Sequence, residues 1–288
     1  MLGRIITIER IKPSLVANLF GLQSLRYILA HIIYNVRFKK DLNKSNHTIT
    51  AKTEGYCKIS NFINNKHLGD IKKEFESLIN SVHCKNLQND GTNYLTVYLN
   101  DKKIYENYPT LKRVIEDKRV QELFCESENK KNTNIYCRLE RIIVKDKNIE
   151  DTNKNFHYDS YHNTFKAWFY ISESNDKNGP LVLIPGSHKF SLKRVWNSYL
   201  ESIKFSFFVK KNKKFKSKNI PNNFAVDNYQ YFRFKNKNHS LDKKANKLIS
   251  NENTFLFVNT HCVHRRGDAE ENYARDSIHF YSRENPLD

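Results

Sequence analysis

The sequence lacks paired cysteines, and this excludes two classes of small stabilised domain. Its 288 residues include only five cysteines, an odd number, and no two of them form a Cys-x-x-Cys pair. Disulfide scaffolds and zinc knuckles depend on such pairing, so neither is expected. Unpaired cysteines favour a reducing compartment, and we expect a cytoplasmic protein. The length accommodates one large β domain or two small ones, with a buried core.

The chain also lacks a long uninterrupted apolar run. Its most apolar early segment, residues 14–36, is broken by Asn18, Arg26 and His31, which makes it too polar for a confident transmembrane helix. Charged residues such as Arg4 come early, and no small-residue cleavage site follows. We therefore expect neither a membrane span nor a secretory signal.

The N-terminal segment nevertheless has a helical pattern. Apolar residues recur at helical spacing at Leu22, Leu25, Leu29, Ile32 and Val36. We predict a helical extension over residues 1–45, ahead of a catalytic domain over 46–288. The helix would either pack on that domain or make a peripheral contact through residues 14–40 with the inner face of a membrane. In the second case the basic residues that follow the stripe would lie on anionic headgroups.

Acidic residues are too few to balance the basic ones. The chain has 49 Lys and Arg against 31 Asp and Glu, a formal net charge of +18. One interpretation is a general bias of the composition towards lysine. The other is attraction to anions such as phosphorylated or CoA-linked substrates, nucleic acid or an acidic membrane.

Short alternating, aromatic segments dominate the second half of the sequence and predict strands. They are residues 136–144, 165–171, 181–184, 205–209, 254–258 and 277–281. Two helices are predicted earlier, one with an apolar face at Leu68, Ile71, Phe75 and Leu78, the other spanning residues 111–124. Many short strands indicate a mainly β sandwich or barrel with flanking helices. Residues 190–250 are long for a connection and predict an insert that shapes the substrate site.

His157 and Asp159 form the most informative motif of the chain. On a strand, side chains two residues apart point to the same side, so this imidazole and carboxylate can reach one metal ion. One further histidine would complete the two-histidine, one-carboxylate set that holds non-haem Fe(II). The segment Thr260–Gly267 supplies two candidates, His261 and His264. Arg275, eleven residues beyond His264, is a fork suited to a carboxylate.

The surroundings of these residues resemble the phytanoyl-CoA dioxygenase family. Residues 156–171 resemble the iron-binding segment of that family, and residues 179–188 resemble its next strand and Pro-Gly-Ser-His turn. Residues 253–275 are similar to the segment that carries the distal histidine and a 2-oxoglutarate-binding arginine. Residues 55–63 are similar to the opening strand. The likeness extends over roughly residues 50–285.

This resemblance implies a double-stranded β-helix, a jelly roll of the cupin type. It implies Fe(II) held by His157, Asp159 and His264, with 2-oxoglutarate as cosubstrate gripped by Arg275, and O2 as oxidant. It favours His264 over His261 as the distal ligand. Lys166 is expected either to assist in binding 2-oxoglutarate or the substrate, or to be a lysine at the barrel mouth. His162 is left out of the site.

The predicted function is therefore hydroxylation of a small or membrane-presented, anionic molecule, with a glycolipid or lipopolysaccharide sugar as a narrower suggestion. A nucleic-acid demethylase of the same superfamily is one alternative, although nucleic acid is not favoured. In such enzymes a second arginine closely follows the first, whereas here the six-residue step from Arg275 reaches Tyr281. A non-catalytic, cupin-like binding protein is the other alternative.

Overall fold

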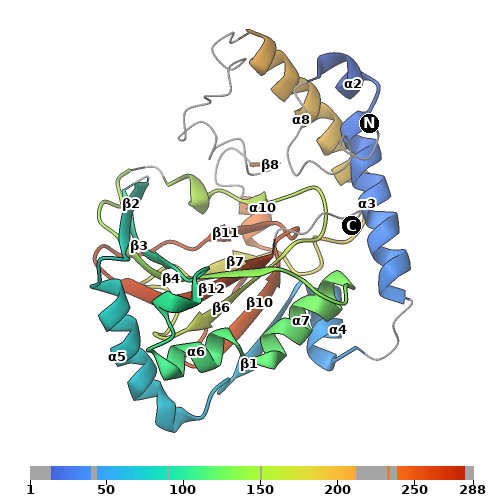
Figure 1. The fold of residues 1–288 in the computed structure, drawn as a ribbon. Coiled ribbons are helices and arrows are strands. Elements are labelled where there is room, and N and C mark those ends of the chain that lie inside the picture. Colours follow the sequence, from blue (N-terminus) through green and yellow to red (C-terminus); the bar gives the residue numbers. More distant parts are fainter. Residues whose placement is uncertain are drawn as a thin grey trace.

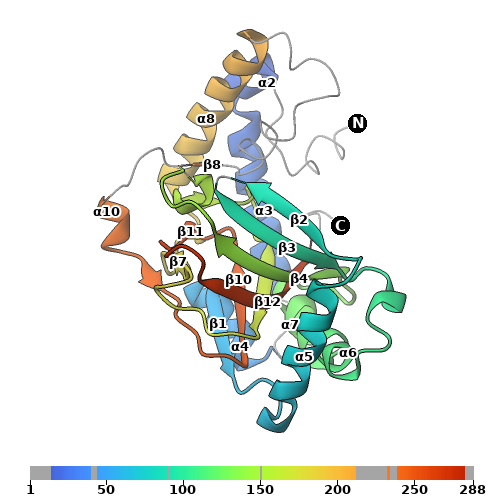
Figure 2. The same cartoon turned by 90° about the vertical axis from the view of Figure 1, so that its left-hand side faces the viewer.

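The computed structural model describes residues 14–39, 44–89, 91–149, 151–211, 232–233 and 239–282. Two antiparallel sheets form its centre, with helices on one side and a helical projection at one end (Figures 1 and 2). The expected mainly β fold with flanking helices is confirmed. Within the predicted insert 190–250, residues 212–231 and 234–238 lie outside the described residues.

The larger sheet has seven strands in the order β1-β10-β6-β12-β4-β3-β2. These strands are β1 (Tyr56–Ser60), β10 (Thr254–Asn259), β6 (Phe165–Tyr170), β12 (Ala274–Ser282), β4 (Ile135–Val144), β3 (Thr92–Tyr98) and β2 (Lys85–Asn89). Apart from the hairpin of β2 and β3, its neighbouring strands are far apart in the sequence, as expected for a jelly roll.

The smaller sheet has five strands in the order β8-β5-β11-β7-β9. These are β8 (Phe232–Arg233), β5 (His157–Tyr158), β11 (His264–Arg266), β7 (Leu181–Leu183) and β9 (Asn246–Lys247). An apolar cluster joins the inner faces of the two sheets, with Leu256 and Val258 from β10 packed near Leu183 from β7 and Cys262. The two sheets therefore close on one another and enclose the inner space.

Helices cover the outer face of the larger sheet. They are α4 (Asn46–Glu54), α5 (Leu68–Ile79), α6 (Pro109–Ile115) and α7 (Lys118–Glu128), with short 3-10 turns at η1 (Asn65–His67), η2 (Lys102–Ile104) and η3 (Thr152–Lys154). Alternate strand residues such as Phe169, Phe257 and Phe280 point into this core and meet Phe75 of α5 and Phe124 of α7. The opposite residues of each strand are thus left facing the inner space.

Two sequence predictions about local structure were wrong. Residues 111–124 form two helices because the chain breaks at Asp117, whose side chain accepts a hydrogen bond from the backbone N–H of Arg119 and begins α7. Residues 205–209 belong to the helix α8 (Leu192–Lys211), not to a strand. Their aromatic composition favoured a strand locally, but this segment continues a helix that packs on the N-terminal helices.

The N-terminal helices α2 (Leu15–Leu19) and α3 (Leu22–Lys39) pack against α8 and extend beyond the sheets (Figures 1 and 2). The short helix α10 (His239–Asp242) follows β8. Among the described residues, no helix is both long and apolar enough to cross a membrane.

Candidate active site

Three side chains from separate segments converge at one end of the smaller sheet. His157 and His264 are directly opposite each other on the antiparallel strands β5 and β11. Asp159 follows β5, and its backbone N–H donates to the carbonyl of Thr260 at 3.1 Å. This bond joins the chain after β5 to the segment that leads into β11. Two segments about a hundred residues apart in the sequence therefore lie side by side at the site.

The ligand atoms of the three residues lie within 4.8 Å of one another. The Nε2 atoms of His157 and His264 are each 3.7 Å from Oδ1 of Asp159, and the two imidazole centroids are 4.5 Å apart. Two imidazole nitrogens and one carboxylate oxygen around a common point match the facial set that binds non-haem Fe(II).

Backbone carbonyls fix the orientation of both histidines. Nδ1 of His157 donates to the carbonyl of Asn155 at 2.7 Å, and Nδ1 of His264 donates to the carbonyl of Cys262 at 2.8 Å. Because the proton is on Nδ1, each Nε2 keeps its lone pair for a metal. Burial also lowers the pKa of His264, against the opposing effect of Asp159, which favours the neutral ring that a metal requires.

Lys166 contacts the remaining oxygen of Asp159. Its Nζ lies 2.6 Å from Oδ2, while Oδ1 faces the two histidines. Burial by itself raises the pKa of Asp159, but the positive charge of Lys166 and the two imidazoles outweigh it and hold that pKa far below its ordinary value. The carboxylate is therefore ionised, with one oxygen directed to the histidines.

The other candidate histidines lie outside this cluster. The ring of His261 is fully buried, with Nδ1 donating to the carbonyl of Ser160 at 2.9 Å. His162 is also buried, with Nδ1 donating to the carbonyl of Asn163 at 3.0 Å. The structure thus brings His264, and not His261 or His162, beside His157 and Asp159.

Arg275 lies on the inner face of β12, where it is 7% exposed. Its Nη1 donates to the carbonyl of Gly179, but its Nε has no hydrogen-bond partner among the described residues. Ser277 and His279 follow on the same face, and the hydroxyl of Ser277 and both ring nitrogens of His279 are likewise buried without a described partner. Such orphaned groups are rare unless a ligand satisfies them.

The register of β6 and β12 orders these residues into a row. Lys166 pairs with Tyr281, Trp168 with His279, and Tyr170 with Ser277, so Arg275 lies beyond the last pair. Arg275 and Tyr281, the partner of Lys166, are six residues apart on β12, which corresponds to about 20 Å of backbone. The long side chains of Lys166 and Arg275 shorten the distance between their charged groups. The indole of Trp168 stacks on the imidazole of His279, with ring centroids 4.9 Å apart and an angle of 3° between the ring planes.

Ser277 and His279 were missed as site residues by sequence reasoning. The signal was present, because they share the period-two face of Arg275 on a predicted strand. Arg138 joins this inner face on β4, opposite His279, and pairs with the buried carboxylate of Glu140 at 2.7 Å. Arg141, by contrast, lies on the outer face, where its Nε is 2.7 Å from Oδ1 of Asp276.

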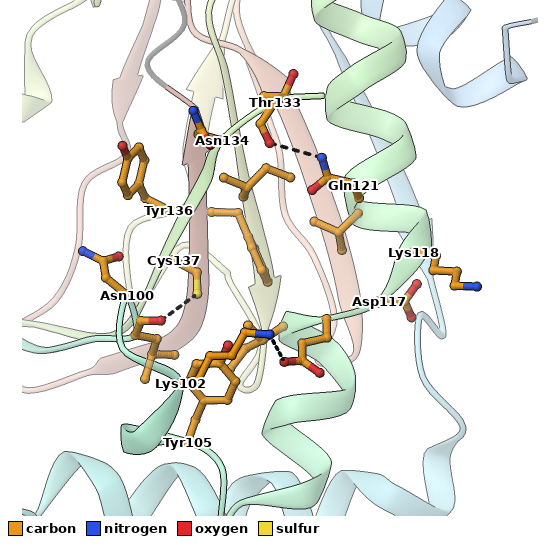
Figure 3. Close-up of a pocket in the computed structure, with 16 residues that line it drawn as sticks. Asn100, Lys102, Tyr105, Asp117, Lys118, Gln121, Thr133, Asn134, Tyr136 and Cys137 are labelled. Atoms are coloured by element: carbon orange, nitrogen blue, oxygen red, sulfur yellow. Dashed lines mark hydrogen bonds and ion pairs between the residues drawn. The ribbon is translucent and has the colours of Figure 1, made fainter. Parts of the chain in front are cut away.

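Two cavities of about 580 Å³ each lie elsewhere on the molecule. The first, shown in Figure 3, opens between α6, α7 and the start of β4, and is lined by residues such as Tyr105, Gln121 and Cys137. The second is lined by residues that include Asn155, Phe156 and Arg265, which lie within two positions of His157 or His264 in the sequence. Neither lining includes His157, Asp159 or His264.

Comparison with known families agrees with this geometry. The profile described as phytanoyl-CoA dioxygenase matches residues 51–201, more than half of the chain. The chain belongs to the phytanoyl-CoA dioxygenase family. Among curated proteins none matches the sequence.

Solved structures of similar fold cover most of the chain. The epimerase SnoN, in complex with Fe3+, α-ketoglutarate and nogalamycin RO, has a TM-score of 0.52 at 11% identity, over 86% of this chain and 84% of that one. EctD from S. alaskensis with bound Fe has a TM-score of 0.48 at 11% identity, over 83% and 76%. At such identity the likeness to SnoN shows the fold alone.

Family membership also gives the enzyme class. The protein is a non-haem iron, 2-oxoglutarate-dependent oxygenase. Its cofactor is iron and its cosubstrates are 2-oxoglutarate and O2, which the sequence resemblance led us to expect.

Proposed function

We propose that His157, Asp159 and His264 hold the catalytic Fe(II) of a hydroxylase that acts on a small anionic molecule. The observation that carries the assignment of the metal ligands is the convergence of two Nε2 atoms and Oδ1 around one point, with both Nδ1 atoms bonded to backbone carbonyls. Three protein ligands leave the other coordination positions of iron available.

The unpaired polar groups on β12 suit 2-oxoglutarate. Arg275 can offer its guanidinium to the far carboxylate of this diacid, with the hydroxyl of Ser277 beside it on the same strand face. The Nε of Arg275 and the hydroxyl of Ser277, both without a partner among the described residues, are donors of the kind that a carboxylate needs. Iron and 2-oxoglutarate together supply the oxidising chemistry with O2, and the protein supplies geometry and selectivity.

The chain positions these groups through its own contacts. Lys166 holds Oδ2 of Asp159 so that Oδ1 stays directed towards the histidines. The expected role of Lys166 in binding 2-oxoglutarate remains a prediction, and we propose this positioning role beside it. Leu256 and Val258 on β10 line the same inner face with apolar surface, which limits the access of water to the reaction.

An anionic substrate is supported by the charge of the chain as a whole, a formal net charge of +18. Within the inner space, Lys166 and Arg138 are paired with Asp159 and Glu140, and Arg275 is the cation that we assign to 2-oxoglutarate. Surplus positive charge outside these pairs attracts anions. A membrane-presented glycolipid or lipopolysaccharide sugar is a narrower candidate, favoured by the exposed apolar surface described in the next subsection.

The two alternative functions receive less support. The helices α2, α3 and α8 expose apolar side chains such as Phe20, Leu25 and Trp196. A nucleic-acid surface instead requires basic and polar groups, since these bind phosphate. A non-catalytic binding protein would be expected to have a defective ligand set, whereas His157, Asp159 and His264 all have their ligand atoms directed to one point.

An anaerobic titration of the apoprotein with Fe(II) and 2-oxoglutarate tests the assignment. We expect the visible charge-transfer band of iron-chelated 2-oxoglutarate in the wild type, and its loss in His157→Ala and His264→Ala. His47→Ala, which removes an exposed histidine on α4, is the matched control and should keep the band. His261→Ala distinguishes the two distal candidates. A band that survives His264→Ala but is lost in a folded His261→Ala would overturn the proposed ligand set.

A further inference from the structure

The helix α3 is packed the opposite way round from its sequence pattern. Three of the five residues of its predicted apolar stripe, Leu25, Ile32 and Val36, are each about half exposed, whereas Leu22 and Leu29 are partly buried. The face that is buried carries Gln23, Arg26, Tyr27 and Ala30. A surface helix normally buries its apolar stripe. The helix α3 packs on the domain, one of the two arrangements that the sequence left open, but it does so through this other face and leaves most of the stripe outward.

Specific contacts hold this reversed orientation. The guanidinium of Arg26 lies 4.3 Å from the ring centroid of Tyr161 and donates to Gln23 at 2.7 Å. The ring of Tyr27 stacks on Phe190 and lies 5.8 Å from the imidazole of His261. These polar and aromatic contacts give the buried face partners within the domain, so the outward stripe follows from a defined packing.

The helix α8 repeats the same arrangement. It buries Ser198, Ser202 and Ser206 at four-residue spacing, and the side-chain amide of Asn18 in α2 donates to the hydroxyl of Ser206 at 2.8 Å. Its exposed face carries large apolar residues, namely Leu192, Trp196, Leu200 and Phe207. In α2 the neighbouring Phe20 is 88% exposed. A monomeric soluble surface rarely groups so many large apolar side chains.

The charge of these helices indicates what the stripes contact. Residues 14–39 contain no acidic residue, and Glu201 is the only acid in residues 189–211. The exposed lysines Lys193 and Lys204 lie on α8, and Arg37 lies near the end of α3. Helices with an apolar stripe, aromatic residues and basic flanks bind in the interface of anionic membranes.

We propose that α2, α3 and α8 form a docking surface for an anionic lipid bilayer, with Phe20, Trp196 and Phe207 inserted and the lysines on the headgroups. Both cartoon views show α2 and α8 standing beyond the sheets, while α3 runs from them alongside the domain (Figures 1 and 2). A second copy of the chain is a poorer partner for this surface, because it would place basic helices against basic helices.

The surface is also linked to the active site through Arg194 of α8. Its guanidinium donates to the carbonyls of Ser187 and His261, and it lies 4.1 Å from the ring centroid of Tyr158. Tyr158 stands between His157 and Asp159 in the sequence. These contacts join the docking surface to the segments that carry the site.

Vesicle binding tests this inference without metal, 2-oxoglutarate or turnover, so its outcome is independent of the proposed function. The probes are vesicles of phosphatidylcholine alone and of equal parts phosphatidylcholine and phosphatidylglycerol, in a flotation assay. We expect binding to the phosphatidylglycerol vesicles only, weakened by salt. Lys193→Gln should reduce the partition coefficient about fivefold.

The triple variant Phe20→Ser, Trp196→Ser, Phe207→Ser tests the apolar contribution. It should bind more than about tenfold more weakly, since these side chains no longer enter the lipid. The matched control is Val82→Ser, Leu87→Ser, Ile249→Ser, which removes three exposed apolar side chains elsewhere and should bind like the wild type. Circular dichroism confirms that both variants are folded.

Tryptophan emission gives an independent readout. The chain has two tryptophans, Trp168 and Trp196, so Trp168→Phe leaves Trp196 as the sole reporter. Its emission should shift to the blue and be quenched by brominated acyl chains. Equal binding to both vesicle types, or unchanged binding of the triple variant, would overturn the proposal. A wild-type dimer that the triple variant converts to a monomer would assign the surface to a second copy.

Discussion

Arg275 and Arg138 are the two arginines that face the inner space, and one substitution in each separates their roles. We predict that Arg275→Ala weakens 2-oxoglutarate binding strongly, whereas Arg138→Ala does not. Both arginines have a buried Nε without a hydrogen-bond partner among the described residues, so the difference lies in their charges. Arg138 pairs with Glu140 at 2.7 Å, whereas Arg275 is buried and donates to the uncharged carbonyl of Gly179.

The magnitude follows from the burial of the arginine. Removing one partner of a buried, hydrogen-bonded charge pair costs about 2–5 kcal/mol, which corresponds to an increase in Kd of roughly 30-fold to several thousand-fold. Arg275→Lys keeps the charge but loses the planar fork, and we expect an intermediate Kd. Both substitutions also free the carbonyl of Gly179, so a modest fall in thermal stability is expected as well.

The assay is the charge-transfer band, titrated with 2-oxoglutarate at saturating Fe(II) without oxygen. Arg113→Ala, on the exposed surface of α6, is the control for the loss of one arginine and should leave Kd unchanged. If Arg275→Ala binds 2-oxoglutarate normally while Arg138→Ala does not, the clamp is Arg138 and our reasoning from the pairing of Arg138 with Glu140 is refuted.

Two further predictions concern stability. Gly55→Ala should destabilise the fold by more than about 2 kcal/mol in urea unfolding, because φ is +89° and a Cβ there would overlap Sγ of Cys262. Gly69→Ala, in open space within α5, should instead stabilise by about 0.5–1 kcal/mol, and a similar cost at both sites would contradict the steric argument. Burial lowers the pKa of His162 and His188 to about 4, below the value of about 6.5 in the unfolded chain. Their contribution to stability is therefore complete above pH 6.5 and is lost as the pH falls towards 4, by on the order of 2 kcal/mol for each histidine at pH 5. Urea midpoints at pH 7.5 and 5 measure this, and His162→Gln should reduce the difference; equal dependence on pH in that variant would exclude neutral burial of His162.

Strands were easier to predict than helices in this chain. The alternating segments at residues 136–144, 165–171 and 254–258 correspond to β4, β6 and β10. Their residues alternate because one face of each strand packs under the helices and the opposite face lines the inner space. The strand β2 was missed, since its polar residues do not alternate with apolar ones. The prediction of a strand at residues 205–209 was wrong. It was based on the aromatic content of this short segment and overlooked the helical spacing of apolar residues that includes Trp196 and Phe207.

The site was predictable where motif and local geometry coincide. His157 and Asp159 are two residues apart in the sequence, and their spacing alone suggested one metal site. The choice between His261 and His264 could not be derived from spacing, because either can follow the strand β10. Pairing of His264 with His157 across β11 and β5 decides which imidazole reaches the carboxylate.

The sequence by itself determined the family and the fold class, and it supplied the residues that we propose to bind iron and 2-oxoglutarate, because these depend on local periodicity and short motifs. Tertiary structure alone decided which groups meet across the sheets. The pairing of β12 with β6 places His279 against Trp168 and Ser277 against Tyr170. It also decided that α3 and α8 turn their apolar stripes outward, since a helical pattern specifies a stripe but not the surface that covers it.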